Sequence, residues 1–284
     1  MRSIFFERKD TINCNGNLID LSTPKIMGIV NVTPDSFYDG GNYNTIDLAV
    51  KQVKKHLEEG ADFIDIGGYS SRPDAKHISP EEELKRVLPV LKEIVRQFPE
   101  AVVSVDTFRS SIAEKTVQNG ASIINDISAG EMDAKMLETI ADLQVPYIAM
   151  HMKGTPRTMQ KNPNYGNVTE DLIYYFSKKI DNINTLGIND IILDVGFGFG
   201  KSIADNYKLL ANLDLFKLFK IPILIGVSRK SMLYKPLEIT AAESLNASSI
   251  AHTIALQNGA NVLRVHDVKE ALECVKIYNL LKNE

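Results

Sequence analysis

The chain has 284 residues, of which 44% are hydrophobic and 24% charged, a balance that excludes a disordered protein. Lys and Arg number 32 against 36 Asp and Glu, so the net charge of −4 provides no basic surface for nucleic acid, and we expect no such partner. The two cysteines, Cys14 and Cys274, are too few for a disulfide framework and fit a reducing compartment.

The first 25 residues stand apart from the rest of the chain. Ile4, Phe5 and Phe6 are followed at once by charged residues, which is not the apolar region of a signal peptide. No apolar run elsewhere approaches the ~18 residues of a membrane span. We therefore expect a cytoplasmic protein with no membrane partner, in which residues 1–25 form a short N-terminal β-strand extension that caps the bottom of the main domain.

From residue 26 onward, short β-branched runs alternate with helical segments. The strand candidates are Ile26–Val30, Phe63–Ile66, Val102–Val105, Ile123–Asn125, Pro146–Met150, Ile191–Leu193, Ile223–Ile225 and Val262–Val265. These runs are almost continuously apolar, as expected of parallel strands that are covered on both faces. Fewer units would leave an open, doubly wound sheet, whereas eight favour an α/β fold with a closed (β/α)8 TIM barrel. No linker divides the chain, so we predict one domain over residues 1–284.

Glycines mark the ends of several predicted helices. Gly60, Gly120 and Gly259 each follow a helical pattern and precede a strand. Glycine is suited to the left-handed position that ends a helix, so a short turn can lead directly into the next strand. This repeated pattern supports the predicted barrel.

Polar residues gather where the strands end. In a (β/α)8 barrel the active site lies at the carboxyl ends of the strands. The residues at these ends are Asn31, the 67–74 loop, Asp106, Asn125, Asp126, His151, Asp194, Arg229, Lys230, Arg264 and His266. Helix capping accounts for any single Asp or Asn among them. It does not account for carboxylates, amides and cations on one rim, a set that is typical of a site for a polar ligand together with an anion.

Common nucleotide, metal and hydrolase motifs do not fit this sequence. The segment Gly196–Ser202 resembles a phosphate loop, but Val195 stands where that loop needs its first glycine. The third glycine of a dinucleotide fingerprint would fall on Lys201. We interpret the segment as a tight strand-to-helix turn whose phenylalanines shield the pocket. The five histidines have no zinc-binding spacing, and Gly-x-Ser-x-Gly is absent.

A set of motifs in the right order resembles dihydropteroate synthase. Ile29–Phe37 is similar to the first signature of that family and Asp65–Pro73 to the second. The resemblance continues through residues 105–107, 124–127, 150–152, 194–201, 228–231 and 264–267 and covers the chain from about Lys25 to its end. It implies a TIM-barrel transferase of the stand-alone bacterial type, with Mg²⁺ as cofactor and a homodimeric assembly.

The resemblance also implies the reaction. Such an enzyme joins 6-hydroxymethyl-7,8-dihydropterin pyrophosphate to 4-aminobenzoate, releases pyrophosphate and forms 7,8-dihydropteroate for folate biosynthesis. It is the target of sulfonamide drugs, which mimic 4-aminobenzoate. A pterin presents adjacent N–H donors that one carboxylate can accept in a bidentate pair, which fits the carboxylates of the rim.

Site residues are carried over from the matching motifs. The resemblance implies that Arg72, Lys230, Arg264 and His266 are catalytic and that Asn31 binds Mg²⁺. It places Asp194 on the donor edge of the pterin and the guanidinium of Arg264 on the ring face. The substrate-binding residues that it implies are Asn31, Ser71, Arg72, Pro73, Asp106, Asn125, Ile127, Met150, Asp194, Phe199, Gly226, Lys230, Ser231, Arg264 and His266.

One loop departs from the family, and other functions stay open. The family sequence Glu-Ser-Thr-Arg-Pro-Gly is Tyr69–Asp74 here, with Ser71 and Asp74 among the changes, which concerns substrate affinity and sulfonamide response. A pterin-dependent methyltransferase would have no pyrophosphate to hold, and Arg72 and the 264–266 pair argue against it. A non-catalytic pterin-binding paralogue would be expected to lose pyrophosphate ligands. A barrel aldolase would need a lysine within a strand core, and the predicted strand cores contain none.

Overall fold

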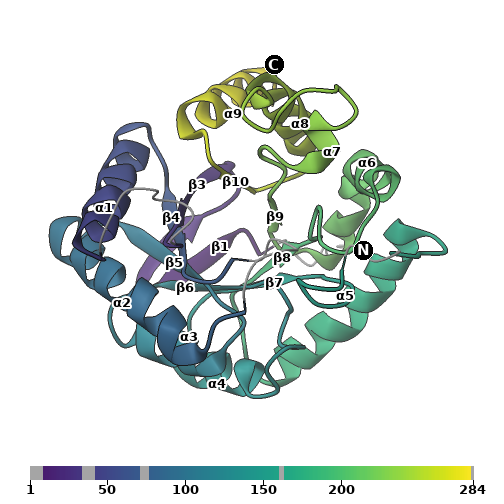
Figure 1. The fold of residues 1–284 in the computed structure, drawn as a ribbon. Helices are drawn as coiled ribbons and strands as arrows, with labels where there is room; N and C mark the ends of the chain where they lie inside the picture. The colour runs from purple at the N-terminus through teal and green to yellow at the C-terminus, as the bar shows by residue number, and fades with distance from the viewer. Residues whose placement is uncertain (1–8, 34–41, 71–76, 160–162, 283–284) are drawn as a thin grey trace, which may run out of the picture.

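The structure is a computed structural model that describes residues 9–33, 42–70, 77–159 and 163–282. Eight parallel strands close into a barrel in the order β10-β3-β4-β5-β6-β7-β8-β9 (Figure 1). The strands are β3 (Lys25–Asn31), β4 (Phe63–Gly67), β5 (Val102–Asp106), β6 (Ile123–Asp126), β7 (Tyr147–Met150), β8 (Ile191–Asp194), β9 (Ile223–Ile225) and β10 (Val262–Val265). The predicted TIM barrel is confirmed, and each predicted strand lies within one residue of its observed bounds.

Helices surround the barrel and alternate with its strands (Figure 1). They are α1 (Asn42–Glu58), α2 (Pro80–Gln97), α3 (Ser110–Val117), α4 (Met136–Leu143), α5 (Val168–Thr185), α6 (Ile203–Ala211), η2 (Leu213–Phe219), α7 (Ser231–Tyr234), α8 (Leu245–Gln257) and α9 (Val268–Lys282). Gly60, Gly120 and Gly259 have φ values of +97°, +103° and +102° where helices end, as predicted. In the part of the chain that the structure describes, no helix has the length and apolarity needed to cross a membrane.

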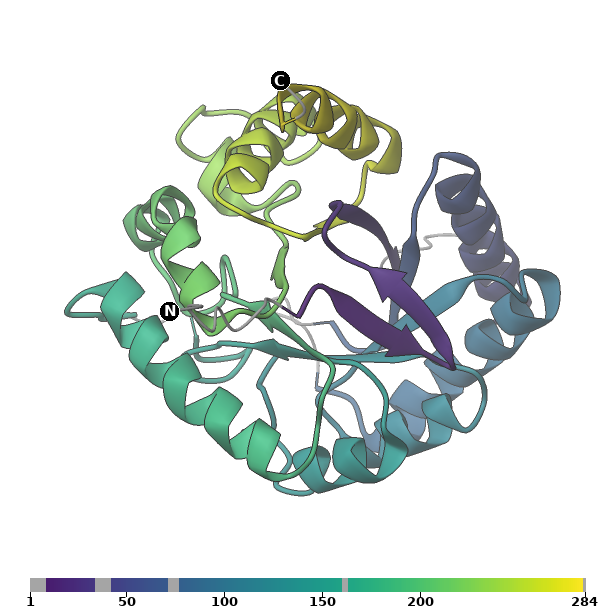
Figure 2. The same cartoon turned by 180° about the vertical axis from the view of Figure 1, so that it is seen from behind.

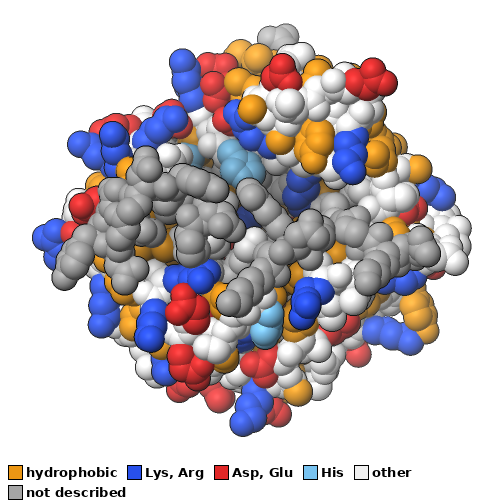
Figure 3. All heavy atoms as spheres, in the orientation of Figure 1, with side chains coloured by type: hydrophobic (Ala, Val, Ile, Leu, Met, Phe, Trp, Pro, Cys, Tyr) orange, Lys and Arg blue, Asp and Glu red, His pale blue; other side chains and the backbone are white. Residues whose placement is uncertain are grey.

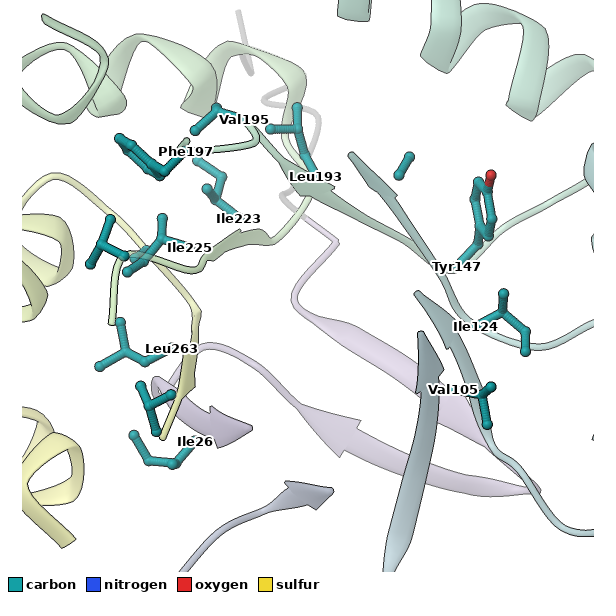
Figure 4. Close-up of a cluster of buried hydrophobic side chains, with 14 of the residues drawn as sticks. Ile26, Val105, Ile124, Tyr147, Leu193, Val195, Phe197, Ile223, Ile225 and Leu263 are labelled. Atoms are coloured by element: carbon teal, nitrogen blue, oxygen red, sulfur yellow. The ribbon is translucent and has the colours of Figure 1, made fainter. Parts of the chain in front are cut away.

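Strand parity divides the apolar residues between two cores. Neighbouring residues of a strand point to opposite faces, so one set faces the helices and the next faces the barrel axis. Ile26, Tyr147 and Leu263 belong to the outer core between strands and helices, part of which Figure 4 shows. The inner core consists of Met27, Phe63, Val102, Ile123, Ile148, Ile192, Leu224 and Val262 with residues of the N-terminal hairpin.

An antiparallel hairpin lies across the amino-terminal end of the barrel. Its strands are β1 (Thr11–Cys14) and β2 (Asn17–Asp20). In Figure 2, which shows the side opposite to Figure 1, the hairpin lies between the viewer and the barrel. Ile12, Cys14 and Leu21 pack with the inner core. The side chain of Asn261 donates a 2.7 Å hydrogen bond to the carbonyl oxygen of Leu21. The polar residues at the opposite end therefore form the accessible mouth of the barrel.

A buried ion pair connects two loops at that mouth. Glu83 of α2 is fully buried and bonds to the guanidinium of Arg109, and Thr107 donates a 2.6 Å hydrogen bond to the same carboxylate. Arg109 also donates to the carbonyl oxygen of Ile78 at 2.6 Å. Burial raises the pKa of Glu83, whereas Thr107 and Arg109 lower it. The pair therefore joins the segment before α2 to the loop after β5.

We expect Arg109→Ala to lower the free energy of unfolding by about 3–5 kcal/mol, because it leaves the carboxylate of Glu83 buried without its cation. Urea denaturation measures this change. The control Arg96→Ala breaks an exposed pair with Glu93 and should leave stability unchanged. Equal effects of the two substitutions would contradict a structural role for the buried pair.

Candidate active site

The polar residues occupy the next inward positions above the apolar inner core. Two residues beyond Phe63, Val102 and Ile123 along the same strands lie Asp65, Ser104 and Asn125. The same spacing leads from Ile192 to Asp194 and from Val262 to Arg264. Register places Asp106 of β5 beside Asn125 of β6, and Met150 of β7 beside Asp194 of β8. Strand parity thus brings these side chains to one interior layer.

A cavity of about 280 Å³ opens above this layer. Its lining consists of Ile29, Asn31, Thr33, Tyr69, Ser70, Asp106, Asn125, Ile127, Met150, Asp194, Phe199, Gly226, Ser228, Arg229, Lys230, Arg264 and His266. Figure 3 shows basic side chains and a histidine around the hollow at the centre of this face. Apolar, acidic and basic groups therefore share one cavity.

Arg264 lies between two carboxylates. Its Nε donates to Asp65 Oδ2 at 2.7 Å, and its Nη2 donates to Asp106 Oδ2 at 2.9 Å. Asp65 is fully buried and also accepts hydrogen bonds from Ser104 at 2.6 Å and Asn125 at 3.1 Å. Burial raises the pKa of Asp106, and Arg264 opposes that shift. The planar guanidinium is thereby fixed at the cavity wall.

Asp194 and Lys230 are oppositely charged groups that line the same cavity. Asp194 Oδ1 accepts a 2.8 Å hydrogen bond from the backbone N–H of Gly196, the one donor to this carboxylate among the described residues. Burial raises the pKa of Asp194, and the cation of Lys230 lowers it. Burial lowers the pKa of Lys230 to about 8. A carboxylate with free acceptor capacity therefore stands beside an ammonium group inside the cavity.

The glycine-rich segment is a tight turn after β8. Gly196, Gly198 and Gly200 have φ values of +71°, +80° and +64°. A Cβ atom on Gly196 would lie 2.0 Å from the carbonyl oxygen of His151, so only glycine fits there. Phe199 of this turn lines the cavity, and the carbonyl oxygen of Phe197 accepts a hydrogen bond from Lys230. The turn thus contributes both an aromatic ring and a backbone acceptor.

A bidentate ion pair joins the loops after β9 and β10. Arg229 donates from Nε and Nη2 to the two oxygens of Asp267, each at 2.8 Å. Its φ of +54° is rare outside glycine and turns the chain just before Lys230. Ser228 Oγ lies 3.1 Å from His266 Nδ1. The neighbours of Lys230 and His266 are therefore tied to each other.

Most of the residues proposed from sequence line this cavity. They are Asn31, Asp106, Asn125, Ile127, Met150, Asp194, Phe199, Gly226, Lys230, Arg264 and His266. Ser231 begins α7 next to Lys230 but is not among the lining residues. Ser71, Arg72 and Pro73 lie outside the described residues, so their roles stay predictions. The proposed set did not include Asp65, Tyr69, Ser228 or Arg229, although strand parity would have placed Asp65 inside the barrel.

The donors available to a metal ion are few. Among the described residues, no group of three or more His, Cys, Asp or Glu side chains could hold a metal ion. Asn31, at the end of β3, is exposed and lines the cavity. Mg²⁺ accepts one or two protein oxygens when substrate phosphates and water complete its octahedron. The donor set fits Mg²⁺ held mainly by a phosphorylated substrate.

Sequence comparison relates the chain to pterin enzymes. Residues 27–266 match the protein family described as "Pterin binding enzyme". The dihydropteroate synthase of Escherichia coli K12 is 44% identical over 265 residues, which cover 92% of this chain and 93% of the relative. That of Haemophilus influenzae is 43% identical over 271 residues, covering 95% and 98%.

Solved structures agree with these relatives. Yersinia pestis dihydropteroate synthase in complex with a sulfonamide drug has a TM-score of 0.89 and 40% identity, covering 96% of this chain and 99% of its own. Xanthomonas albilineans dihydropteroate synthase with 4-aminobenzoic acid has a TM-score of 0.91 and 38% identity, covering 97% and 99%. The same enzyme in complex with 7,8-dihydropteroate has a TM-score of 0.87 and 36% identity, covering 96% and 99%.

We expect Asp65→Asn to lower the free energy of unfolding by about 3–5 kcal/mol, because Arg264 loses the charge of its more deeply buried partner. Ser104→Ala removes only one hydrogen bond to Asp65 and should cost about 1 kcal/mol. Urea denaturation of both variants separates the contribution of the Asp65 charge from that of the hydrogen bond. A loss for Asp65→Asn no larger than that for Ser104→Ala would show that the charge of Asp65 contributes nothing.

Proposed function

This chain belongs to the dihydropteroate synthases of the pterin-binding enzyme family, and we propose how the residues of its cavity carry out the reaction of that family. A dihydropteroate synthase is a transferase that joins 6-hydroxymethyl-7,8-dihydropterin pyrophosphate to 4-aminobenzoate and releases pyrophosphate. The observation that supports our proposal most strongly is that Asp194, Lys230 and Arg264 all line one cavity. These groups complement a ring with both donors and acceptors and a pyrophosphate group beside it.

The pterin ring occupies the inner layer of the cavity in this proposal. The carboxylate of Asp194 accepts the adjacent N–H donors of the pterin, as a charge-assisted bidentate pair. Lys230 donates to the ring carbonyl on the other side, while Asp106 and Asn125 supply further hydrogen bonds. Ile127 and Met150 are buried and line the cavity, so they pack on the ring, and Gly226 leaves room beside it. Arg264, already held flat by its two carboxylates, stacks on the ring face.

Pyrophosphate lies toward the mouth of the cavity. Asn31, Arg264 and His266 line the cavity, and we assign Arg72, which lies outside the described residues, to the same group from the family resemblance. Their donors neutralise negative charge as it grows on the leaving oxygen, which lowers the barrier to bond breaking. The amide oxygen of Asn31 would hold Mg²⁺ together with the pyrophosphate. When bound, Mg²⁺ supplies additional positive charge to the leaving group.

4-Aminobenzoate completes the reacting pair. Phe199 provides an aromatic surface at the cavity wall, and Ser71, Pro73 and Ser231 are the further contacts that we assign to this substrate. The amine nitrogen forms a bond to the methylene carbon of the pterin, the carbon–oxygen bond to pyrophosphate breaks, and the nitrogen loses a proton. The displacement needs no protein nucleophile, because positioning and charge stabilisation are sufficient for it.

The direct test is pyrophosphate release by the purified protein with Mg²⁺ and the pterin pyrophosphate, with and without 4-aminobenzoate. We expect release that requires 4-aminobenzoate, yields dihydropteroate and stops when EDTA removes Mg²⁺. Pterin binding without release would instead identify a non-catalytic pterin-binding protein. Undiminished release in EDTA would refute the assigned role of Mg²⁺ but not the assigned reaction.

We expect Asp194→Asn to weaken pterin binding at least about 10²-fold, since two charge-assisted hydrogen bonds are lost. Isothermal calorimetry with a pterin measures the affinity, and circular dichroism establishes that the variant is folded. Asp205→Asn is a matched control, because Asp205 caps α6 outside the cavity. Near-native pterin affinity in Asp194→Asn would refute the assigned contact.

The pH dependence of the reaction should report on Lys230. Burial lowers its pKa to about 8, so the ammonium is present below that pH and is lost as the pH rises through it. We expect kcat/KM for the pterin pyrophosphate to fall above about pH 8. A variant Lys230→Gln should have low activity and lack this alkaline limb. If the limb persists in the variant, another group is responsible for it.

We propose that the protein assembles as a homodimer through α8 and α9, which pack against each other. These helices expose the apolar side chains of Ile250, Ile254, Ile277, Leu280 and Leu281. Exposed apolar patches of this kind mark protein interfaces. A second copy of the chain would cover the patch without a new partner.

Light scattering tests this assembly. The double substitution Ile277→Glu with Leu280→Glu should convert a dimer into a monomer, since it places charge on the apolar face. Leu18→Glu is the control, because Leu18 is similarly exposed but lies on the N-terminal hairpin and not on α8 or α9. A dimer that survives the double substitution would place the interface elsewhere.

We also propose that the protein works in the cytoplasm. Cys14 and Cys274 are both buried free thiols, which fits a reducing compartment. Burial raises the pKa of Cys14 to about 12, so this thiol stays protonated and unreactive.

A further inference from the structure

Lys201 is the buried cation of the cavity region that the proposed reaction does not use. Its side chain is 3% exposed and lies directly behind the Gly196–Gly200 turn. Its Nζ lies 2.9 Å from the carbonyl oxygen of Gly196, 3.1 Å from that of Phe199 and 3.3 Å from that of His151. A fourth acceptor, His151 Nδ1, lies at 3.0 Å. The ammonium group is thus surrounded by acceptors, and Lys201 is not among the residues that line the active-site cavity.

The ring of His151 is suited to accept this bond. Burial and the neighbouring Lys201 lower the pKa of His151 to about 2, so the ring is neutral. A neutral imidazole can carry its proton on Nε2 and leave Nδ1 as an acceptor. Lys201 therefore connects the end of β7 to both ends of the turn.

The turn needs such a connection because glycine contributes no side chain to hold it. Its three glycines are all in the left-handed region, and glycine loses more backbone freedom on folding than any other residue. Besides Lys201, Asn206 accepts a 2.7 Å hydrogen bond from the N–H of Gly198. The carbonyl oxygen bonded to Lys201 at the far end of the turn belongs to Phe199, whose ring lines the cavity. Moving that carbonyl moves the ring.

We propose that Lys201 is a positioning residue for 4-aminobenzoate: its ammonium group closes the Gly196–Gly200 turn and thereby fixes the ring of Phe199 at the cavity wall. This inference rests on the proposed function, which assigns that ring to 4-aminobenzoate. Lys201 also acts on Asp194 electrostatically: burial lowers the pKa of Lys201 to about 7, so its ammonium form is present at acidic pH, where it lowers the pKa of Asp194. The charged and donor groups that face Asp194 are Lys230, Arg264, Lys201 and the N–H of Gly196.

Lys201→Met tests the proposal, because methionine has a similar length and no charge. We expect kcat/KM for 4-aminobenzoate to fall about 10²-fold, mainly through KM, as the ring of Phe199 shifts. Because Asp194 binds the pterin as a carboxylate, pterin binding should be lost at low pH as that group gains a proton. We expect this acid limb to move to higher pH in Lys201→Met, since Asp194 loses one of its three neighbouring cations. Loosening of the turn alone would not move this limb.

The control is Lys153→Met, which removes the charge of an exposed lysine near the same turn whose ammonium group bonds to the carbonyl oxygen of Asn164 and lies over the ring of Tyr165. It should leave both readouts unchanged. Asn206→Ala loosens the turn but keeps the charge of Lys201, so it should raise KM for 4-aminobenzoate without moving the acid limb. This second variant keeps the proposal testable if Lys201→Met does not fold.

The outcomes separate the two proposals. If the unmodified protein makes no dihydropteroate, the proposed function fails before Lys201 is tested. If the unmodified protein is active and Lys201→Met keeps its KM for 4-aminobenzoate and its acid limb, the positioning role is refuted. A rise in KM in Lys201→Met that Asn206→Ala does not share would overturn the route through the turn.

Discussion

The cavity depends on one guanidinium group held between two carboxylates. Arg264 comes from β10, whereas Asp65 and Asp106 come from β4 and β5, so the network crosses the barrel mouth over the intervening strand β3. Burying three charges costs solvation energy that only close pairing and further hydrogen bonds can offset. Ser104 and Asn125 supply those bonds to Asp65. A closed barrel is well suited to this arrangement, because it brings strand ends that are remote in sequence within one hydrogen bond of each other.

This network determines which groups are left for a ligand. Asp65 is fully engaged within the protein, whereas Asp194 has a single protein donor among the described residues. Arg264 keeps one planar face available while its edge is bonded. The cavity can therefore accept the donor edge of a ring at Asp194, its face at Arg264 and an anion near the exposed ends of β3 and β10. Pre-organised charges of this kind contribute most to catalysis when they need not rearrange during the reaction.

The fold could be predicted from sequence because parallel strands in a barrel are continuous apolar runs, and eight of them were separated by clear helical patterns. The residues that follow the strands, such as Asp106 and Lys230, could be located for the same reason. The role of Asp65 could not, since it lies within a strand and its partner is 199 positions away. Arg229 was recognised as a rim residue, but its left-handed backbone and its pairing with Asp267 depend on two loops that pack only in the folded protein. Lys201 belongs to a segment that only resembles a phosphate loop. Its four acceptors could not be predicted, because they come together only when the turn packs against the end of β7 in the folded protein.

The most direct test of this account is a crystal structure of the protein with a pterin in the cavity. The account predicts the donor edge of the pterin within hydrogen-bond distance of the Asp194 carboxylate. It also predicts that Arg264 lies over the ring while still bonded to Asp65 and Asp106. A pterin whose edge is bound by Asp106, with Arg264 released from both carboxylates, would contradict the central claim that the network holds Arg264 in place and leaves Asp194 for the ligand.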